Sequence, residues 1–184
     1  MEPNTKIVYR IDSQDRIVYV NDNWHKFAEE NDALELTKSS ILYRSLWDFI
    51  TDETSRHFYR EVIQRVRADK PVFFNFRCDS PSHKRLMGMN ISYESGEVVF
   101  QTDTIRLELR KPQSILDRNK QRSDEIVVIC GWCKKINMGK MLWKEIEHAI
   151  AALKIFEAEK LPMLSHGMCN NCYVDFFSNL KNIA

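Results

Sequence analysis

Two pairs of cysteines near the C-terminal end constrain the fold of this chain more than any other feature. Cys130 and Cys133 form the first pair, Cys169 and Cys172 form the second, and 35 residues separate the pairs. Two C-x-x-C pairs with this spacing are typical of a tetrahedral zinc site, because each short turn directs two sulfurs at one metal about 2.3 Å away. The sequence therefore predicts zinc as a cofactor, held by these four thiolates in a structural site.

Other chemistries remain open for the same four sulfurs. One pair could cycle as a redox dithiol, and four thiolates could also hold an iron–sulfur cluster. Covalent haem attachment is not expected, because no histidine follows either pair. His166 precedes Cys169 by three residues and could replace one sulfur ligand. Because four cysteines already complete a site, His166 is expected instead to lie in a turn or to contact a ligand without binding the metal.

The segments that flank the cysteine pairs predict how the pairs are presented. Residues 126–129 are β-rich and lead into the first pair, where Gly131 would give the turn its freedom, and residues 173–177 predict a helix after the second pair. Lys134 and Lys135 follow the first pair, and their charges would offset the net charge of about −2 on a four-thiolate zinc centre. By analogy, a strand-turn pair and a helix-start pair resemble a treble-clef zinc module.

The residues between the two pairs predict one helix. The apolar positions that recur at helical spacing are Leu142, Ile146, Ala149, Ile150, Leu153 and Phe156. Pro162 would end this helical region. A module of residues 126–184 is small enough to need a staple, which the metal would supply.

Composition restricts the class of protein and its partners. The 184 residues are 43% hydrophobic and 29% charged, as in folded proteins, and the net charge of +1 creates no field that attracts nucleic acid. The helix predicted between the two cysteine pairs also lacks a basic face, so nucleic acid is not an expected partner. No apolar run approaches the roughly 18 residues that span a bilayer, and no signal peptide is evident, which predicts a cytoplasmic protein without a membrane partner. Thiols stay reduced there, in agreement with metal ligation.

The first hundred residues predict an α+β domain. Two short β-rich runs precede several helices, and three closely spaced β-runs follow, which must pair antiparallel. The predicted strands are 6–11, 16–20, 72–78, 84–94 and 97–108. Thr51 or Asp52 would cap the longest helix, whose apolar face comprises Phe58, Val62, Ile63 and Val66.

Three segments of this region resemble a PAS domain. They are Arg-Ile-Val-Tyr-Val-Asn-Asp-Asn-Trp at 16–24, Ser-Leu-Trp-Asp-Phe-Ile at 45–50 and Phe-Arg-Cys-Asp-Ser-Pro at 76–81. The resemblance covers roughly residues 5–109, and it implies a PAS-like five-stranded antiparallel sheet with helices on one face, a pocket between them, and a sensory or dimerisation role. The segments Cys-Gly-Trp-Cys-Lys-Lys-Ile and Ser-His-Gly-Met-Cys-Asn-Asn-Cys resemble a cysteine-rich tail found in some bacterial PAS and signalling proteins.

The resemblance also implies candidate residues for a ligand pocket. They are Phe58, Val62, Phe74, Phe76, Met87, Met89 and Phe100. These side chains either fill the core or surround a small ligand whose identity is unknown. His57 stands where haem-binding PAS domains place their axial histidine, although its position at the edge of the apolar face also fits a surface residue. Cys78 is expected to be a free thiol, since no flavin-attachment motif surrounds it.

A charged segment joins the predicted strands 72–78 and 84–94. Residues 79–82 form a turn by composition, with Arg77, His83, Lys84 and Arg85 nearby. These charges are either simply solvated or arranged to hold an anion.

These observations predict a PAS-like sensory domain at 1–110, a linker at 111–125 and a zinc module at 126–184. The expected function is that of a signalling protein that binds a small ligand or a protein partner, with homodimerisation among its modes of association. The alternative is a redox or metal sensor in which the zinc-bound thiolates are the switch. No catalytic motif is present, so an enzyme is not expected.

Overall fold

The computed structural model describes residues 6–31, 33, 35–155 and 160–182, without the side chains of 179–182. The fold is mixed α+β, with two compact units. The first unit comprises Met1–Asn75 and Met87–Ile105, and the second comprises Phe76–Leu86 and Arg106–Ala184.

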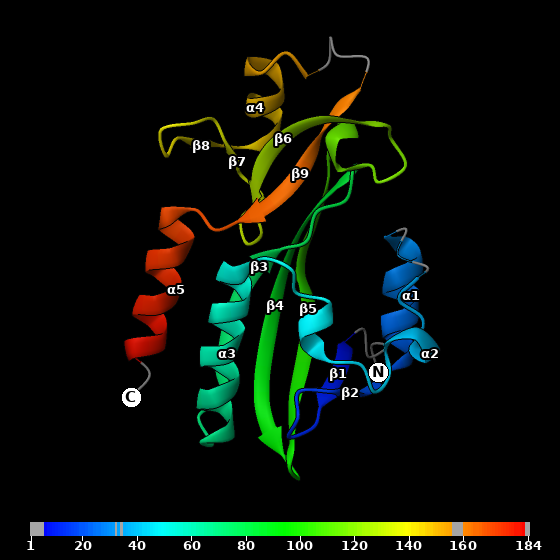
Figure 1. Cartoon of the computed structure of the whole chain (residues 1–184), viewed down its shortest axis with the longest axis vertical. Helices are drawn as coiled ribbons and strands as arrows, with labels where there is room; N and C mark the ends of the chain where they lie inside the picture. Colours follow the sequence, from blue (N-terminus) through cyan, green and yellow to red (C-terminus); the bar gives the residue numbers. More distant parts are fainter. Residues whose placement is uncertain (1–5, 32, 34, 156–159, 183–184) are drawn as a thin grey trace. The chain divides into compact units, whose positions relative to one another are not determined.

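The first unit contains the predicted five-stranded antiparallel sheet, in the order β2-β1-β5-β4-β3 (Figure 1). Its strands are β1 (Ile7–Ile11), β2 (Ile17–Val20), β3 (Val72–Arg77), β4 (His83–Glu94) and β5 (Glu97–Leu109), of which the last three continue into the second unit. Its helices are α1 (Asp22–Glu30), α2 (Lys38–Ile41), η1 (Leu46–Asp48) and α3 (Glu53–Arg67). The α+β class and the five-stranded antiparallel sheet predicted from the sequence are therefore confirmed.

Local signals explain where these elements begin and turn. The side chain of Asn21 accepts the backbone N–H of Trp24 at 3.2 Å and caps α1, and Asp52, one of the two predicted caps, starts α3 in the same way. Ser95 and Gly96 both have positive φ, at 52° and 88°, as a two-residue hairpin between β4 and β5 requires. The order of elements in this unit follows from its sequence.

Helix α3 covers the sheet with the apolar face that its sequence predicts. All four residues of that face are buried: Phe58, Val62, Ile63 and Val66. The rings of Phe58 and Phe74 meet edge to face at 5.4 Å, and the ring of Tyr59 lies 6.4 Å from that of Phe100. The core of the first unit therefore lies between α3 and the sheet (Figure 1).

The second unit contains a four-stranded sheet in the order β8-β7-β6-β9. Its elements are η2 (Ser114–Leu116), β6 (Arg122–Cys130), β7 (Ile136–Asn137), β8 (Trp143–Lys144), α4 (Ile146–Ala152), β9 (Leu161–Gly167) and α5 (Asn170–Asn182). The β6–β9 pair is parallel and the other two are antiparallel. Its core comprises Ile115, Ile129, Ile136, Ile146, Ala149, Ile150 and Ile155. The C-terminal module is thus a small mixed α/β unit, where the sequence predicted a helical one.

Two predictions for this unit fail in detail. Pro162, expected to end a helix, lies within β9 at the irregular part of its pairing with β6, where a missing N–H is tolerated. Helix α4 is also shorter than the predicted apolar stripe. Leu142 and Leu153 lie outside it, and they are 52% and 41% exposed. Phe156 lies outside the described residues.

The segment predicted as a linker, residues 111–125, has structure of its own. It contains η2 and the first residues of β6, and the side chain of Ile115 is fully buried in the core of the second unit. The domain limits drawn at 110 and 126 remain a prediction. Among the described residues, no helix has the length and apolar character to cross a membrane.

Candidate metal centre

The parallel pairing of β6 and β9 brings the two cysteine pairs together. Cys130 ends β6 and is in register with Gly167, the last residue of β9. Parallel neighbours end at the same edge of a sheet, so the turn after β6 and the start of α5 after β9 meet there. The turn carries the first cysteine pair, and Cys169 and Cys172 stand at the start of α5, as predicted.

The four sulfurs have the spacing of a metal site. Their Sγ atoms all lie within 4.8 Å of one another. The Cys133 and Cys169 sulfurs are 3.7 Å apart, and a tetrahedron with zinc–sulfur arms of about 2.3 Å has edges of about 3.8 Å. Within the described residues, this cluster consists of cysteines alone. It can hold a metal ion.

Backbone N–H groups around the cluster point at sulfur. The N–H of Cys169 donates to the Cys130 sulfur at 3.4 Å, and the N–H of Cys172 donates to the Cys169 sulfur at 3.5 Å. Cys130 and Cys169 are buried, whereas Cys133 and Cys172 are half-buried. Donors of this kind stabilise the thiolate form, which is the form that binds metal.

The thiol pKa values show that these sulfurs cannot all ionise on their own. Hydrogen bonds from Cys133 and Cys172 lower the pKa of Cys130 far below its usual range. The hydrogen bond to Cys130 raises the pKa of Cys133 to about 12 and that of Cys172 still further. Four thiolates this close repel one another unless a cation lies between them, and a divalent metal ion supplies that charge.

The loop that carries the first pair is held by its own backbone. The N–H of Cys130 donates to the carbonyl of Lys135 at 2.8 Å, and the N–H of Lys134 returns to the carbonyl of Cys130 at 3.0 Å. Lys134 has a positive φ of 61°. Gly131, expected to supply the conformational freedom, does not need it, since a Cβ there would lie 3.8 Å from the Gly167 carbonyl oxygen, an ordinary contact.

A group of ion pairs around the buried Asp79 carboxylate reaches this loop through Arg77, and it contradicts the expectation that the charges near residues 77–85 are simply solvated. The side chain of Asp79 is fully buried and pairs with both Arg77 and Arg110, the latter at 3.2 Å. Arg77 also pairs with Glu145 at 2.7 Å, and Arg110 lies 3.5 Å from Glu147. Of the residues considered for an anion site, Arg77 thus binds protein carboxylates, and Lys84 pairs with Glu147 at 3.0 Å.

The residues predicted to line a PAS pocket are mostly in the core of the first unit. Those that are buried are Phe58, Val62, Phe74, Met87, Met89 and Phe100. Phe76 is half-buried and belongs to the second unit. These positions agree with core packing and leave a ligand among them a prediction.

The sulfur cluster includes neither of the two histidines considered from the sequence, nor the fifth cysteine. His57 is exposed on α3, as a surface residue would be, and His166 is exposed in β9 and does not belong to the sulfur cluster. Cys78 is a half-buried free thiol. Among the residues that the structure describes, the candidate site therefore consists of the four cysteines.

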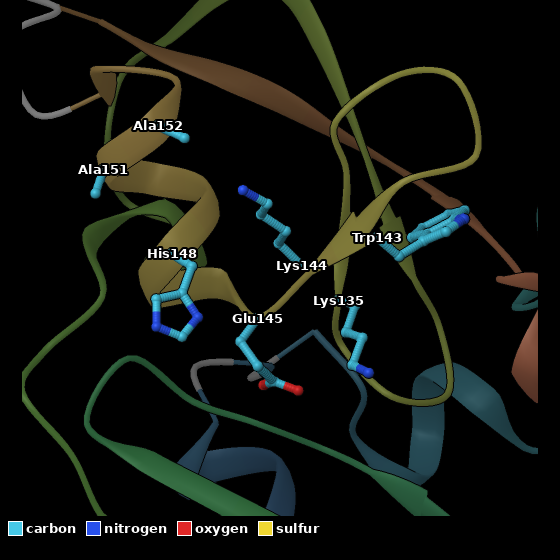
Figure 2. A pocket seen from close by; sticks show the side chains of 7 residues that line it. All are labelled: Lys135, Trp143, Lys144, Glu145, His148, Ala151 and Ala152. Carbon is cyan, nitrogen blue, oxygen red and sulfur yellow. The ribbon is translucent and has the colours of Figure 1, made fainter.

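An open cavity of about 680 Å³ lies in the second unit beside α4 and β8. Its lining residues are Lys135, Trp143, Lys144, Glu145, His148, Ala151 and Ala152 (Figure 2). Two of them are linked to the cysteine loop. The Lys135 carbonyl accepts the N–H of Cys130, and Glu145 pairs with Arg77, which donates to the carbonyl of Cys133. Sequence reasoning missed this cavity and the ion pairs, since nothing local in the sequence signals that their members converge.

Comparison with known proteins gives solved PAS domains as similar structures. No family model matches the sequence, and neither does any curated protein. The PAS domain of BvgS from Bordetella pertussis is 15% identical over 56% of this chain and 79% of that chain, with a TM-score of 0.43. The PAS domain of an HTR-like protein from Haloarcula marismortui is 16% identical over 56% and 84%, with a TM-score of 0.36. A PAS domain of a two-component sensor histidine kinase is 12% identical over 59% and 87%, with a TM-score of 0.31. At these values, the matches say nothing of ligand, partner or activity.

Proposed function

We propose that this chain is a sensory or signalling protein with a structural zinc site. In the proposal its PAS-like unit binds a small ligand or a protein partner, and Cys130, Cys133, Cys169 and Cys172 bind one Zn²⁺. The observation that carries the proposal is the group of four sulfurs within 4.8 Å of one another. The proposal includes a reducing cytoplasmic location, where these thiols would stay available to metal, and assigns the chain no catalytic activity.

Zinc suits this donor set better than the alternatives. It has no preferred geometry of its own beyond four-coordination, it favours thiolates, and closed four-cysteine sites are typically structural. The core of the second unit is small, so a metal that joins the turn after β6 to the start of α5 would contribute directly to its folding. With all four positions taken by protein, no coordination site is open for a substrate.

Native mass spectrometry and elemental analysis of the freshly purified full chain test the metal. One zinc per chain is expected for the wild type, and Cys172→Ser should lose it or bind it far more weakly. Cys78→Ser is the matched control, because Cys78 is not in the cluster, and it should retain one zinc. A folded wild-type chain without stoichiometric metal would overturn the proposal, and iron in place of zinc would convert the site to an iron–sulfur or iron centre.

The same native spectra test the sensory role. A retained small molecule of defined mass, or a homodimer, is expected if the PAS-like unit binds a ligand or associates through its surface. If the protein is instead a monomer that carries only metal, the remaining expectation is that the PAS-like unit binds a different protein. If no specific protein then co-purifies with the chain from its source organism, the result would count against a signalling role.

A thiolate switch is the second candidate, and it is favoured by the half-burial of Cys133 and Cys172. In this reading, hydrogen peroxide oxidises two thiolates to a disulfide and is itself reduced to water, and the weakened site releases zinc. Under mild peroxide, the loss of titratable thiols and the release of zinc, measured together, should then rise in step. Zinc that stays bound until the protein denatures would exclude the switch and leave the structural role.

A further inference from the structure

Every backbone carbonyl of the first cysteine loop, residues 130–133, has a donor. The carbonyl of Cys130 accepts the N–H of Lys134, and that of Gly131 accepts the Lys134 ammonium at 2.8 Å. The other two carbonyls are bound by one residue from far away in the sequence. Arg77 donates its backbone N–H to Trp132 at 2.7 Å and its Nη1 to Cys133 at 3.0 Å.

Arg77 is itself fixed in place by carboxylates. Its guanidinium is paired with Glu145 through the same Nη1 at 2.7 Å, and its Nε donates to Asp79 at 3.2 Å. Only 18% of its side chain is exposed, and the Asp79 side chain is not exposed at all. A planar guanidinium with both edges occupied has little rotational freedom, so it fixes the peptide between Trp132 and Cys133.

We infer that Arg77 is a positioning residue for the metal centre, and that metal binding is thermodynamically linked to the order of residues 76–80. The inference rests on the proposed metal site. The peptide that Arg77 binds determines where the Cys133 sulfur lies, so holding it lowers the cost of assembling the four ligands. By reciprocity, a metal that fixes Cys133 also fixes Arg77.

The position of Arg77 in the chain gives this linkage a direction. Arg77 is the last residue of β3, a strand of the five-stranded sheet that begins at Val72. Binding or loss of the metal would therefore change the order of the backbone at the end of β3, a strand of the PAS-like sheet. The sequence showed no sign of this, because 52 residues lie between Arg77 and Cys130, the first of the four cysteines.

Zinc affinity of the full chain, measured by competition with a chromophoric chelator, tests the positioning role. Arg77→Met should weaken zinc binding about 10- to 100-fold, the usual cost of losing a group that supports a metal ligand. Arg77→Lys keeps the charge but cannot bind two carboxylates and a carbonyl in one plane, so it should also weaken binding, by a smaller factor. Arg110→Met is the matched control, because Arg110 also pairs with Asp79 but, within the described part of the chain, makes no hydrogen bond to the cysteine loop. The zinc affinity of this variant should stay within about threefold of wild type.

Amide hydrogen exchange at residues 76–80, with and without zinc, tests the linkage. Zinc should slow exchange there in the wild type and in Arg110→Met, and should no longer do so in Arg77→Met. Wild-type affinity together with zinc-dependent protection in Arg77→Met would overturn the inference. If circular dichroism shows that Arg77→Met does not fold, the zinc affinity and the amide exchange of Arg77→Lys test the inference in its place. A wild-type chain that takes up no zinc would overturn the proposed function itself, which is a different result from unchanged affinity in the variants.

Discussion

At the scale of single residues, the first cysteine loop shows how a lysine can hold the conformation that a glycine was expected to hold. Lys134 has φ of 61°, and its backbone and ammonium both bond back into the loop. Gly131 directly follows the end of β6, and its N–H donates to the carbonyl of Gly167, the last residue of β9, at 2.9 Å. A glycine in a turn motif is thus not by itself evidence of a left-handed backbone.

Substitutions in this loop should follow the observed dihedrals. Gly131→Ala should leave zinc affinity unchanged and the free energy of unfolding equal or up to about 1 kcal/mol higher, because a Cβ fits and the unfolded chain loses freedom. Lys134→Val should cost about 1–2 kcal/mol or more, because a β-branched residue is strained at positive φ. Chemical denaturation of the zinc-loaded chain measures both. The opposite order of the two effects would contradict the role given to Lys134.

Asp12, in the turn between β1 and β2, provides a pH-dependent contribution to stability. Burial alone would raise the pKa of its carboxyl, but hydrogen bonds from Arg16 and Gln14 and the charge of Arg16 hold the pKa below its usual range. A carboxyl whose pKa is lowered by folding stabilises the protein above its ordinary pKa, and this stabilisation is lost as pH falls through the lowered value.

Asp12→Asn should therefore be destabilising by at most about 1 kcal/mol at neutral pH, the range of exposed ion pairs. The difference from wild type should shrink once the pH falls below about 3.9, the ordinary value for aspartate, and towards the lowered pKa. Urea unfolding of both proteins over a series of pH values measures it. A difference that does not change with pH would show that the asparagine merely alters the turn.

At the scale of elements, the region between the cysteine pairs shows where sequence periodicity misleads. The predicted helical stripe runs from Leu142 to Phe156, but α4 covers only Ile146–Ala152. Glu145 stands at the N-cap of α4, in a strand-to-helix turn after β8, which excludes Leu142 from the helix. The apolar residues at helical spacing are therefore of two kinds. Ile146, Ala149 and Ile150 lie in the core, whereas Leu142 and Leu153 are exposed.

Truncation of two members of the stripe should separate these kinds. Ile150→Ala removes a side chain that is 1% exposed and should cost about 2–5 kcal/mol of unfolding free energy. Leu142→Ala removes one that is 52% exposed and should change stability by about 0.5 kcal/mol or less. Denaturant unfolding of the zinc-loaded full chain measures both. Equal costs would indicate that Leu142 is packed in the core after all.

At the scale of the whole molecule, the two compact units do not depend on the same interactions. The first unit has a core built from α3 and a five-stranded sheet, whereas the second has a smaller core and the sulfur cluster. Anything that binds only the folded form stabilises that form by mass action. A metal at the cysteines should therefore stabilise the second unit in particular.

Removal of the metal by a chelator should thus affect the units unequally. Amide exchange in β6, β9 and α5 should become fast, whereas exchange in β1 and α3 should change little, and zinc should restore the protection. Hydrogen exchange read out by mass spectrometry on the full chain measures both units in one experiment. Equal loss of protection in both units would show that they fold as one cooperative system.

The sequence by itself determined the features that depend on local chemistry. The cap and the apolar face of α3 and the antiparallel pairing of the closely spaced strands depend on residues near one another in the sequence, so each was predicted from periodicity and spacing. The four cysteines were recognised for the same reason, because a C-x-x-C turn directs its own two sulfurs.

Only the tertiary structure decided which distant segments meet. The parallel pairing of β6 with β9 involves a strand that contains a proline and has no alternating pattern, so nothing in its own sequence indicated it. That pairing brings the two half-sites together, and the contacts of Arg77 with Cys133 and Glu145 likewise join residues far apart in the chain. Such contacts form only once the loops between them have closed, and their energy depends on geometry that a linear sequence does not display.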